Sequence, residues 1–209
     1  MIARLAYTAL LWIALPFALA RLAWRARRQP GYLDRLGERF GAAPRATGDP
    51  VIWVHAVSVG ETRAAGPLVE RLRRDHPGAT VLLTHMTPTG RATGREMFGD
   101  AVTQAWLPWD HGFAVRRFLL RARPAFGVLV ETEIWPNLLA ACHDRGVPVF
   151  LVNARGSAAP TFRVLFYAQQ HGDEVSGKDA LLYLVRDLAR IVDRIARGKR
   201  LDDAVDIGA

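Results

Sequence analysis

A segment with the side chains that acid–base chemistry needs lies at Val54-His55-Ala56-Val57-Ser58-Val59-Gly60-Glu61. It begins in the apolar run Val51–Val54, which predicts a buried strand, and it ends in one carboxylate just before a helical pattern. In an open α/β sheet, ligands bind in the loops at the carboxyl ends of the strands. A carboxylate held there, partly removed from water, is a candidate general base, and Glu61 is that carboxylate.

Two further features of the chain bear on this loop. Glu131 and Glu133 directly follow the strongest later apolar run, 126–130. Gly60 and Ser58 are candidate binding residues, because backbone N–H groups at a helix start can receive an anion. The alternative, that Gly60 only permits a tight turn, stays open. No His and Asp arrangement supports Ser58 as a nucleophile, and neither a dinucleotide fingerprint nor a Walker A sequence is present.

The elements that must position these side chains alternate between strand and helix patterns. Strands are predicted at 51–55, 80–84, 101–106, 126–130 and 147–152, and helices at 62–75, 90–98, 111–121 and 136–145. Continuous apolar strands separated by amphipathic helices predict an α/β fold, a Rossmann-like, doubly wound parallel sheet. Right-handed crossovers favour the strand order 3-2-1-4-5. In that order strands one and four are neighbours, so Glu61, Glu131 and Glu133 are expected at one crevice.

The amino-acid composition limits the classes of partner that the chain is expected to bind. The net charge of +8 calls for an acidic partner such as a phospholipid, a phosphorylated substrate or nucleic acid. Residues 1–156 carry 20 arginines and 12 acidic side chains, whereas residues 157–209 carry 8 basic and 8 acidic ones, which suggests a boundary near Gly156. The single cysteine, Cys142, excludes an internal disulfide and lies in an apolar stretch typical of packing. No spacing of ligand types predicts a metal site.

The amino terminus predicts a membrane anchor. Residues 5–20 carry no charge, and four arginines follow within residues 21–28. Positive charge on that side keeps the rest of the chain cytoplasmic and disfavours cleavage of residues 18–20 as an export signal. Whether the helix spans the bilayer or lies in one leaflet stays open. The predicted organisation is an anchor at 1–28, a Rossmann-like domain at 29–156, and a divergent tail at 157–209.

Read together, five segments resemble the Kdo transferases, the 3-deoxy-D-manno-octulosonic acid transferases. The segments are Tyr32–Gly41, Val54–Glu61, Thr87-Pro88-Thr89-Gly90, Glu131-Thr132-Glu133-Ile134-Trp135-Pro136-Asn137 and Asn153-Ala154-Arg155. They occur in the order of the family, and the resemblance covers about residues 30–156. It implies the amino-terminal half of a GT-B glycosyltransferase of lipopolysaccharide biosynthesis, at the cytoplasmic face of the inner membrane.

The resemblance also implies chemistry and residue roles. Kdo would pass from CMP-Kdo to a sugar hydroxyl of the tetraacylated lipid A precursor (lipid IVA), with no metal or other cofactor. Glu61 would be the general base. Glu131 or Glu133 would orient the acceptor, although one of them could instead cap the helix that begins at Pro136. Arg39 and Arg155 would meet acceptor phosphates through forked hydrogen bonds, or pair with neighbouring acids.

The resemblance stops after Arg155 and does not extend into the tail at 157–209. Residues 162–168 predict one strand and residues 178–197 one amphipathic helix, which is too little for the CMP-Kdo-binding domain of the family. Two hypotheses follow from this apparent truncation. The first is a Kdo transferase by descent, whose isolated chain is inactive or needs another polypeptide to bind the donor. The second is a membrane-anchored module that binds the lipid A precursor without catalysis. Membrane lipids are expected partners. Nucleic acid is not, because the arginines cluster beside the apolar anchor without a recognition motif.

Overall fold

The computed structural model describes residues 2–45, 49–130, 135–152 and 164–167. Its centre is one parallel sheet with the strand order β3-β2-β1-β4-β5-β6. The strands are β1 (Val51–His55), β2 (Thr80–His85), β3 (Thr103–Trp106), β4 (Pro124–Val130), β5 (Val149–Val152) and β6 (Val164–Tyr167). The predicted doubly wound sheet is confirmed, and its first five strands have the predicted 3-2-1-4-5 order.

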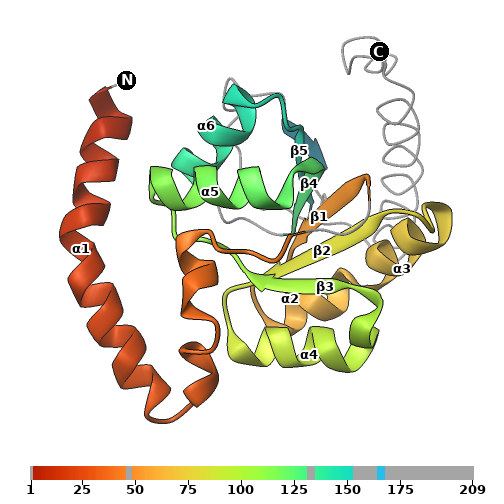
Figure 1. Ribbon diagram of the computed structural model, residues 1–209, viewed down its shortest axis with the longest axis horizontal. Coiled ribbons are helices and arrows are strands. Elements are labelled where there is room, and N and C mark those ends of the chain that lie inside the picture. The colour runs from red at the N-terminus through yellow and green to blue at the C-terminus, as the bar shows by residue number, and fades with distance from the viewer. Residues whose placement is uncertain (1, 46–48, 131–134, 153–163, 168–209) are drawn as a thin grey trace, which may run out of the picture.

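Helices cover both faces of the sheet. They are α1 (Ile2–Ala26), α2 (Val59–Ala64), α3 (Gly66–Asp75), α4 (Pro88–Phe98), α5 (Gly112–Ala122) and α6 (Pro136–Asp144), with short 3-10 turns η1 (Pro30–Tyr32), η2 (Leu36–Phe40) and η3 (Gly99–Ala101). Figure 1 shows α2, α3 and α4 on one side of the sheet, α5 and α6 on the other, and α1 alongside the body. A sheet covered in this way explains why its strands read as continuous apolar runs.

The alternation of side chains along β1 divides the core into two layers. Ile52 and Val54 pack with Leu68 and Leu72 of α3. Trp53 faces the other way, into the layer that α5 and α6 cover. Each of these side chains is at most 1% exposed. Both faces of the central strand are therefore buried, which fixes its register, because a one-residue slip would exchange the layers.

One predicted helix is divided in the structure, and several other predicted elements begin or end at different residues. The helix predicted at 62–75 is two helices, and the first of them begins earlier, at Val59. The break falls at Ala65, because Pro67 has no N–H to donate and occupies the first turn of α3. The strand predicted at 162–168 contains β6, whereas the helix predicted at 178–197 lies outside the described residues. The domain limits near residues 28 and 156 stay predictions.

Trp53 shapes the packing between the two central strands. Its indole N–H donates to Thr84 Oγ1 at 2.8 Å, and its ring lies edge-on to Phe118 with centroids 5.4 Å apart. On β4 the residue paired with Trp53 is Gly127, where an added Cβ would lie 2.8 Å from the indole Cζ3. Glycine at position 127 therefore leaves the space that the indole fills.

Replacing Gly127 by alanine would push a fully buried indole in a close-packed layer. We expect Gly127→Ala to lower the free energy of unfolding by about 1–3 kcal/mol, the usual cost of overpacking. Gly78→Ala is the matched control, because a Cβ at Gly78 meets nothing within 4 Å, and its effect should stay within about 0.5 kcal/mol. Urea unfolding followed by circular dichroism measures both, and equal losses for the two variants would contradict the argument.

Candidate functional site

Glu61 lies where sequence reasoning expected it, in the first turn of α2 directly after β1. β1 pairs in parallel with β2 on one side and with β4 on the other, and His55 at its end pairs with Leu129. The loops after β1 and β4 therefore leave the sheet side by side, at the edge where the strands end (the carboxyl edge). Glu131, Glu133 and Arg155 lie outside the described residues, so their positions stay predictions.

The carboxylate of Glu61 is held by its own turn. The backbone N–H of Val57 donates to Oε2 at 2.6 Å, and the hydroxyl of Ser58 donates to Oε1 at 3.0 Å. Thr62 in turn donates its hydroxyl to the Ser58 carbonyl oxygen at 2.7 Å. A carboxylate oxygen can accept more than one hydrogen bond, so each oxygen keeps room for a further donor. Glu61 is half-buried, and its direction is fixed before any substrate arrives.

Gly60, next to this carboxylate, does not serve a tight turn. It is the second residue of α2 and is not among the glycines with positive φ. It is exposed, and a Cβ added to it would meet nothing within 4 Å. The backbone beside Glu61 therefore stands open to a molecule from outside.

The loop that carries Glu61 rests on the residues after β2. The carbonyl oxygen of Val57 accepts from the Thr87 N–H at 3.2 Å and from the Thr87 hydroxyl at 3.0 Å. The same hydroxyl caps α4 by accepting the N–H of Gly90 at 3.1 Å. A Cβ at Gly90 would lie 3.0 Å from the Val57 carbonyl oxygen. The segment Thr87-Pro88-Thr89-Gly90, to which sequence reasoning assigned no role, thus supports the Glu61 loop.

Two histidines below the loop are core residues. His55 is 1% exposed, and its Nδ1 lies 2.9 Å from Thr84 Oγ1. Burial lowers the pKa of His55 to about 3, and burial lowers the pKa of His85, whose Nδ1 lies 2.9 Å from the Ala56 carbonyl oxygen, to about 4. Both imidazoles are therefore neutral at pH 7. His55 thus has hydrogen-bond partners at Nδ1, whereas its Nε2 has none among the described residues.

Arg39 is buried, whereas an arginine that binds a phosphate from outside would lie at the surface. Its guanidinium lies over the ring of Trp106, 4.3 Å from the centroid, and Nη2 donates to the Met86 carbonyl oxygen at 3.5 Å. The residue is 2% exposed, and burial lowers the pKa of Arg39 to about 10. Binding of an acceptor phosphate by Arg39 would thus require the guanidinium to leave Trp106. Its role as a ligand stays a prediction.

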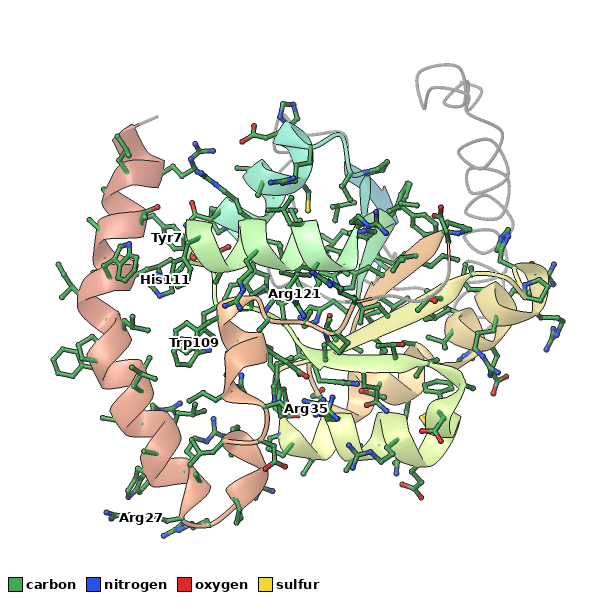
Figure 2. All side chains as sticks on the ribbon, viewed as in Figure 1. Tyr7, Arg27, Arg35, Trp109, His111 and Arg121 are labelled. Atoms are coloured by element: carbon green, nitrogen blue, oxygen red, sulfur yellow. The ribbon has the colours of Figure 1, made fainter. Side chains whose placement is uncertain are left out.

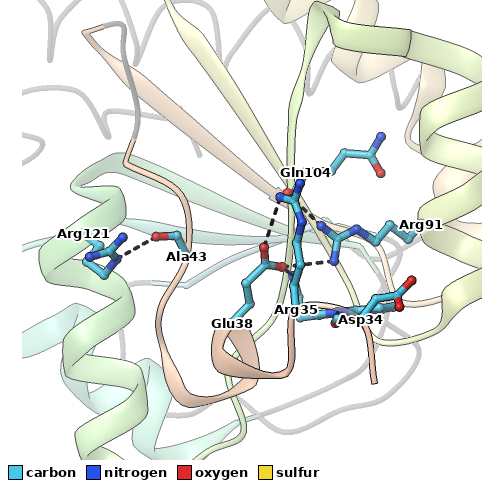
Figure 3. A network of polar contacts seen from close by, with 8 residues as sticks. Asp34, Arg35, Glu38, Ala43, Arg91, Gln104 and Arg121 are labelled. Atoms are coloured by element: carbon cyan, nitrogen blue, oxygen red, sulfur yellow. Dashed lines mark hydrogen bonds and ion pairs between the residues drawn. The ribbon is translucent and has the colours of Figure 1, made fainter. Parts of the chain in front are cut away.

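Glu38 next to it forms a buried ion pair. Its Oε2 accepts from Arg91 Nη1 at 3.0 Å and from the Trp106 N–H at 2.9 Å, and its Oε1 accepts from Arg35 at 3.4 Å (Figure 3). The indole N–H of Trp106 donates back to the Asp34 carbonyl oxygen at 2.6 Å. These contacts fasten residues 34–41 to the end of β3. They explain the Tyr32–Gly41 motif as a structural clamp, which sequence spacing alone does not show.

Asp110 supplies the cap of α6. Its carboxylate accepts the N–H of Asn137 at 2.9 Å and that of Leu138 at 2.7 Å, although it lies in the loop after β3. Burial raises the pKa of Asp110, and these hydrogen bonds oppose that rise. The alternative in which Glu131 or Glu133 caps α6 therefore meets N–H groups that already have a partner. Sequence reasoning missed Asp110 because it also precedes its own helix, α5.

Thiol and metal chemistry have little support among the described residues. Cys142 is buried, as expected, and burial raises the pKa of its thiol to about 12. Across the part of the chain that the structure describes, no three His, Cys, Asp or Glu side chains gather in a way that could hold a metal ion. The arrangement around Glu61 can accept a proton from a hydroxyl presented at the carboxyl edge, as general bases do.

Comparison with known proteins identifies one group of relatives. The model of a family described as 3-deoxy-D-manno-octulosonic-acid transferase (kdotransferase) matches residues 34–197, further along the chain than the motifs reach. The 3-deoxy-D-manno-octulosonic acid transferase of Bordetella pertussis is 46% identical over 179 residues, which cover 78% of this chain and 41% of that protein. The protein of the same name from Haemophilus influenzae is 39% identical over 162 residues, covering 77% of this chain and 38% of that protein.

A more distant relative carries the same similarity. The Arabidopsis thaliana protein named probable 3-deoxy-D-manno-octulosonic acid transferase, mitochondrial, is 33% identical over 153 residues, which cover 72% of this chain and 34% of that protein. The chain thus spans about two fifths of the length of the Bordetella pertussis and Haemophilus influenzae relatives.

The clamp on residues 34–41 gives a prediction about stability. Glu38→Gln removes one charge of a pair whose side chains are 6% and 8% exposed and leaves Arg91 buried without it. We expect a loss of about 3–5 kcal/mol in the free energy of unfolding. The control is Asp75→Asn, which breaks the exposed pair with Arg71 and should cost less than about 1 kcal/mol. Chemical denaturation of both variants tests this, and a similar small loss for both would show that the clamp contributes little.

Proposed function

The chain belongs to the 3-deoxy-D-manno-octulosonic-acid (Kdo) transferase family, and on that premise we propose that it acts in lipopolysaccharide biosynthesis, transferring Kdo from CMP-Kdo to lipid A precursor. The acceptor would be a sugar hydroxyl of the tetraacylated precursor, lipid IVA. The observation that carries the proposal is the carboxylate of Glu61, fixed by two hydrogen bonds at the carboxyl edge of the sheet.

The proposed reaction uses Glu61 as the general base. The carboxylate accepts the proton of the acceptor hydroxyl while that oxygen forms a bond to the anomeric carbon of Kdo. The bond from the anomeric carbon to the phosphate oxygen breaks, and CMP leaves with the electron pair. The proton then passes from Glu61 to solvent. Because the turn orients the carboxylate beforehand, little reorganisation is needed when the hydroxyl arrives.

The other candidate residues would serve the acceptor. The open backbone at Gly60 admits a sugar ring next to Glu61, and Ser58 holds the carboxylate and can turn its hydroxyl toward substrate. Glu131 and Glu133, which follow β4 in the sequence, would orient the acceptor. Arg39 and Arg155 would meet its phosphates. These roles are assigned because each residue lies at the position of this chain that matches the motif of the family.

The membrane is the proposed location of the reaction. The helix α1 contains a segment, Arg4–Ala26, that is long and apolar enough to cross a bilayer. The proposed precursor carries four acyl chains and therefore lies in the membrane. A domain attached to the inner membrane through α1 would meet it there. The arginines in the carboxyl-terminal part of α1 and directly after it favour a cytoplasmic position of the domain.

A second function is favoured by the same hydrogen bonds. A glutamate in the first turn of a helix that reaches back to the preceding loop also stabilises the helix start, so Glu61 could be structural. In that case the chain would be a membrane-anchored module that binds the lipid A precursor without catalysis.

Glu61→Gln separates these functions. The amide keeps the size of the side chain but cannot take up the acceptor proton, so we expect turnover with CMP-Kdo and lipid IVA to fall by about 100-fold or more, with precursor binding retained. Glu70→Gln, an exposed change on α3, is the matched control and should keep full turnover. Precursor binding without turnover by the unaltered chain would favour the module. Equal turnover in both variants would remove Glu61 from the chemistry.

Gly60 provides a test of where the acceptor binds. A leucine there has free space in the structure, so we expect the free energy of unfolding of Gly60→Leu to stay within about 1 kcal/mol of the parent. The added side chain would occupy the proposed path of the sugar, and the Kd of the precursor should rise at least tenfold. Arg63→Leu, an exposed change in the same helix, is the control. Unchanged Kd for Gly60→Leu would place the acceptor elsewhere.

A further inference from the structure

The amino-terminal helix α1 contacts the body near its start, at Trp12 and at its carboxyl-terminal end. Near its start, the Tyr7 hydroxyl donates to Asp110 Oδ2 at 3.0 Å, and Asn137 Nδ2 donates to Thr8 Oγ1 at 3.2 Å. In its middle, Trp12 stacks on Phe113 with centroids 5.7 Å apart. Figure 2 shows Tyr7, Trp109 and His111 between α1 and the rest of the molecule.

The carboxyl-terminal end of α1 is fastened to the same body. Leu22 and Ala26 are buried in a small cluster with Tyr32, against which Trp109 packs. The guanidinium of Arg25 lies over the Tyr32 ring, 4.7 Å from its centroid. Both ends of α1 therefore contact one rigid α/β body, and the helix does not project from it.

A helix fastened in this way cannot cross a bilayer while it stays docked. Its 25 residues span about 37 Å, enough to cross the hydrocarbon core, which is about 30 Å thick. If α1 stood across the membrane, the groups that touch its first half would have to enter the membrane with it. Those groups are the Asp110 carboxylate and the first turn of α6. Placing them in hydrocarbon carries a large desolvation cost.

The face of α1 turned away from the body is apolar. Leu10, Ile13, Phe17 and Trp24 are 58–73% exposed, with Phe17 the most exposed at 73%. On α5, Phe113 and Leu120 are also exposed, at 46% and 60%. An exposed strip of this kind on a docked helix is typical of a surface that meets a membrane.

The charges beside this strip select lipid as its partner. Arg21, Arg25, Arg27 and Arg28 are exposed at one end of α1, and Arg116 and Arg117 are exposed on α5. Anionic headgroups attract such side chains by about 1 kcal/mol each. A second copy of the chain would bring the same positive charges against them, which disfavours a dimer through this face.

We propose that α1 lies in the plane of one leaflet, with Leu10, Ile13, Phe17 and Trp24 in lipid and both of its ends on the side of the domain. This deepens the membrane location given above and rests on it, but it does not depend on the transfer reaction. Since α1 contacts the start of α6, the carboxyl edge of the sheet lies next to the membrane surface in this arrangement. A lipid-borne sugar would then need to rise only a short way to reach Glu61.

Thiol labelling distinguishes an in-plane helix from a spanning one. The native Cys142 is buried, so Ala3→Cys, in the first turn of α1, and Ala92→Cys, exposed on α4, introduce the reactive thiols. A membrane-impermeant maleimide is added to intact spheroplasts and to inverted vesicles. We expect both thiols to be labelled in inverted vesicles and neither in spheroplasts. Labelling of Ala3→Cys in spheroplasts, with Ala92→Cys protected, would show a spanning helix and overturn the proposal. Protection of Ala3→Cys from both sides would overturn it as well.

Flotation with vesicles tests lipid as the occupant. The purified full chain is mixed with vesicles of phosphatidylglycerol and phosphatidylcholine, and the bound fraction is measured. We expect Phe17→Glu to weaken binding at least tenfold, and Met97→Glu, an equivalent change on α4, to leave it unaltered. A dimer that does not float with vesicles would show that a second copy covers the strip, and equal binding of both variants would also contradict the proposal. Neither result would alter turnover by detergent-solubilised protein, which tests the transfer reaction separately.

Discussion

The hydrogen bonds that the Val57 carbonyl oxygen accepts from Thr87 join the loop after β1 to the loop after β2. The rest of the candidate site depends on this junction, because the N–H of the same residue holds the carboxylate of Glu61. One residue, Val57, thus has its carbonyl oxygen fixed by the segment after β2 and its N–H bonded to the proposed base. The parallel pairing of β1 with β2 and β4 brings these loops to one edge, and the junction then sets the direction of the carboxylate.

The arginines of the chain serve two purposes that net charge does not separate. Arg39 and Arg91 both lie over the Trp106 ring, and Arg91 also pairs with Glu38. These two cations stabilise the attachment of residues 34–41 to the sheet and contribute little to the outer surface. The exposed arginines are those beside α1 and on several helices. A basic composition therefore indicates an acidic partner only after the buried cations have been set aside.

Much of the fold could be predicted from the sequence, and the reason is local. Each strand is a continuous apolar run, each helix has its own periodicity, and right-handed crossovers leave few strand orders. The position of Glu61 at the carboxyl edge follows from that order. What could not be predicted depends on residues that are distant in the chain. Asp110 caps α6 across 27 positions, Glu38 pairs with Arg91 across 53, and Trp53 needs a glycine at 127. No local pattern specifies such partners, and the docking of α1 through Tyr7 and Thr8 is of the same kind.

The place of β1 at the centre of the sheet also bears on how the chain reaches its folded state. Ile52 pairs with Val81, 29 residues away, on one side and with Phe126, 74 residues away, on the other. By loop-closure entropy alone, joining β4 to β1 costs about 0.8 kcal/mol more than joining β2 to it. Contacts of long sequence separation slow folding. The seam between β1 and β4 is thus the costlier of the two to form, and the parallel β1–α2–α3–β2 unit, whose partners lie closer in the chain, supplies the template on which it closes.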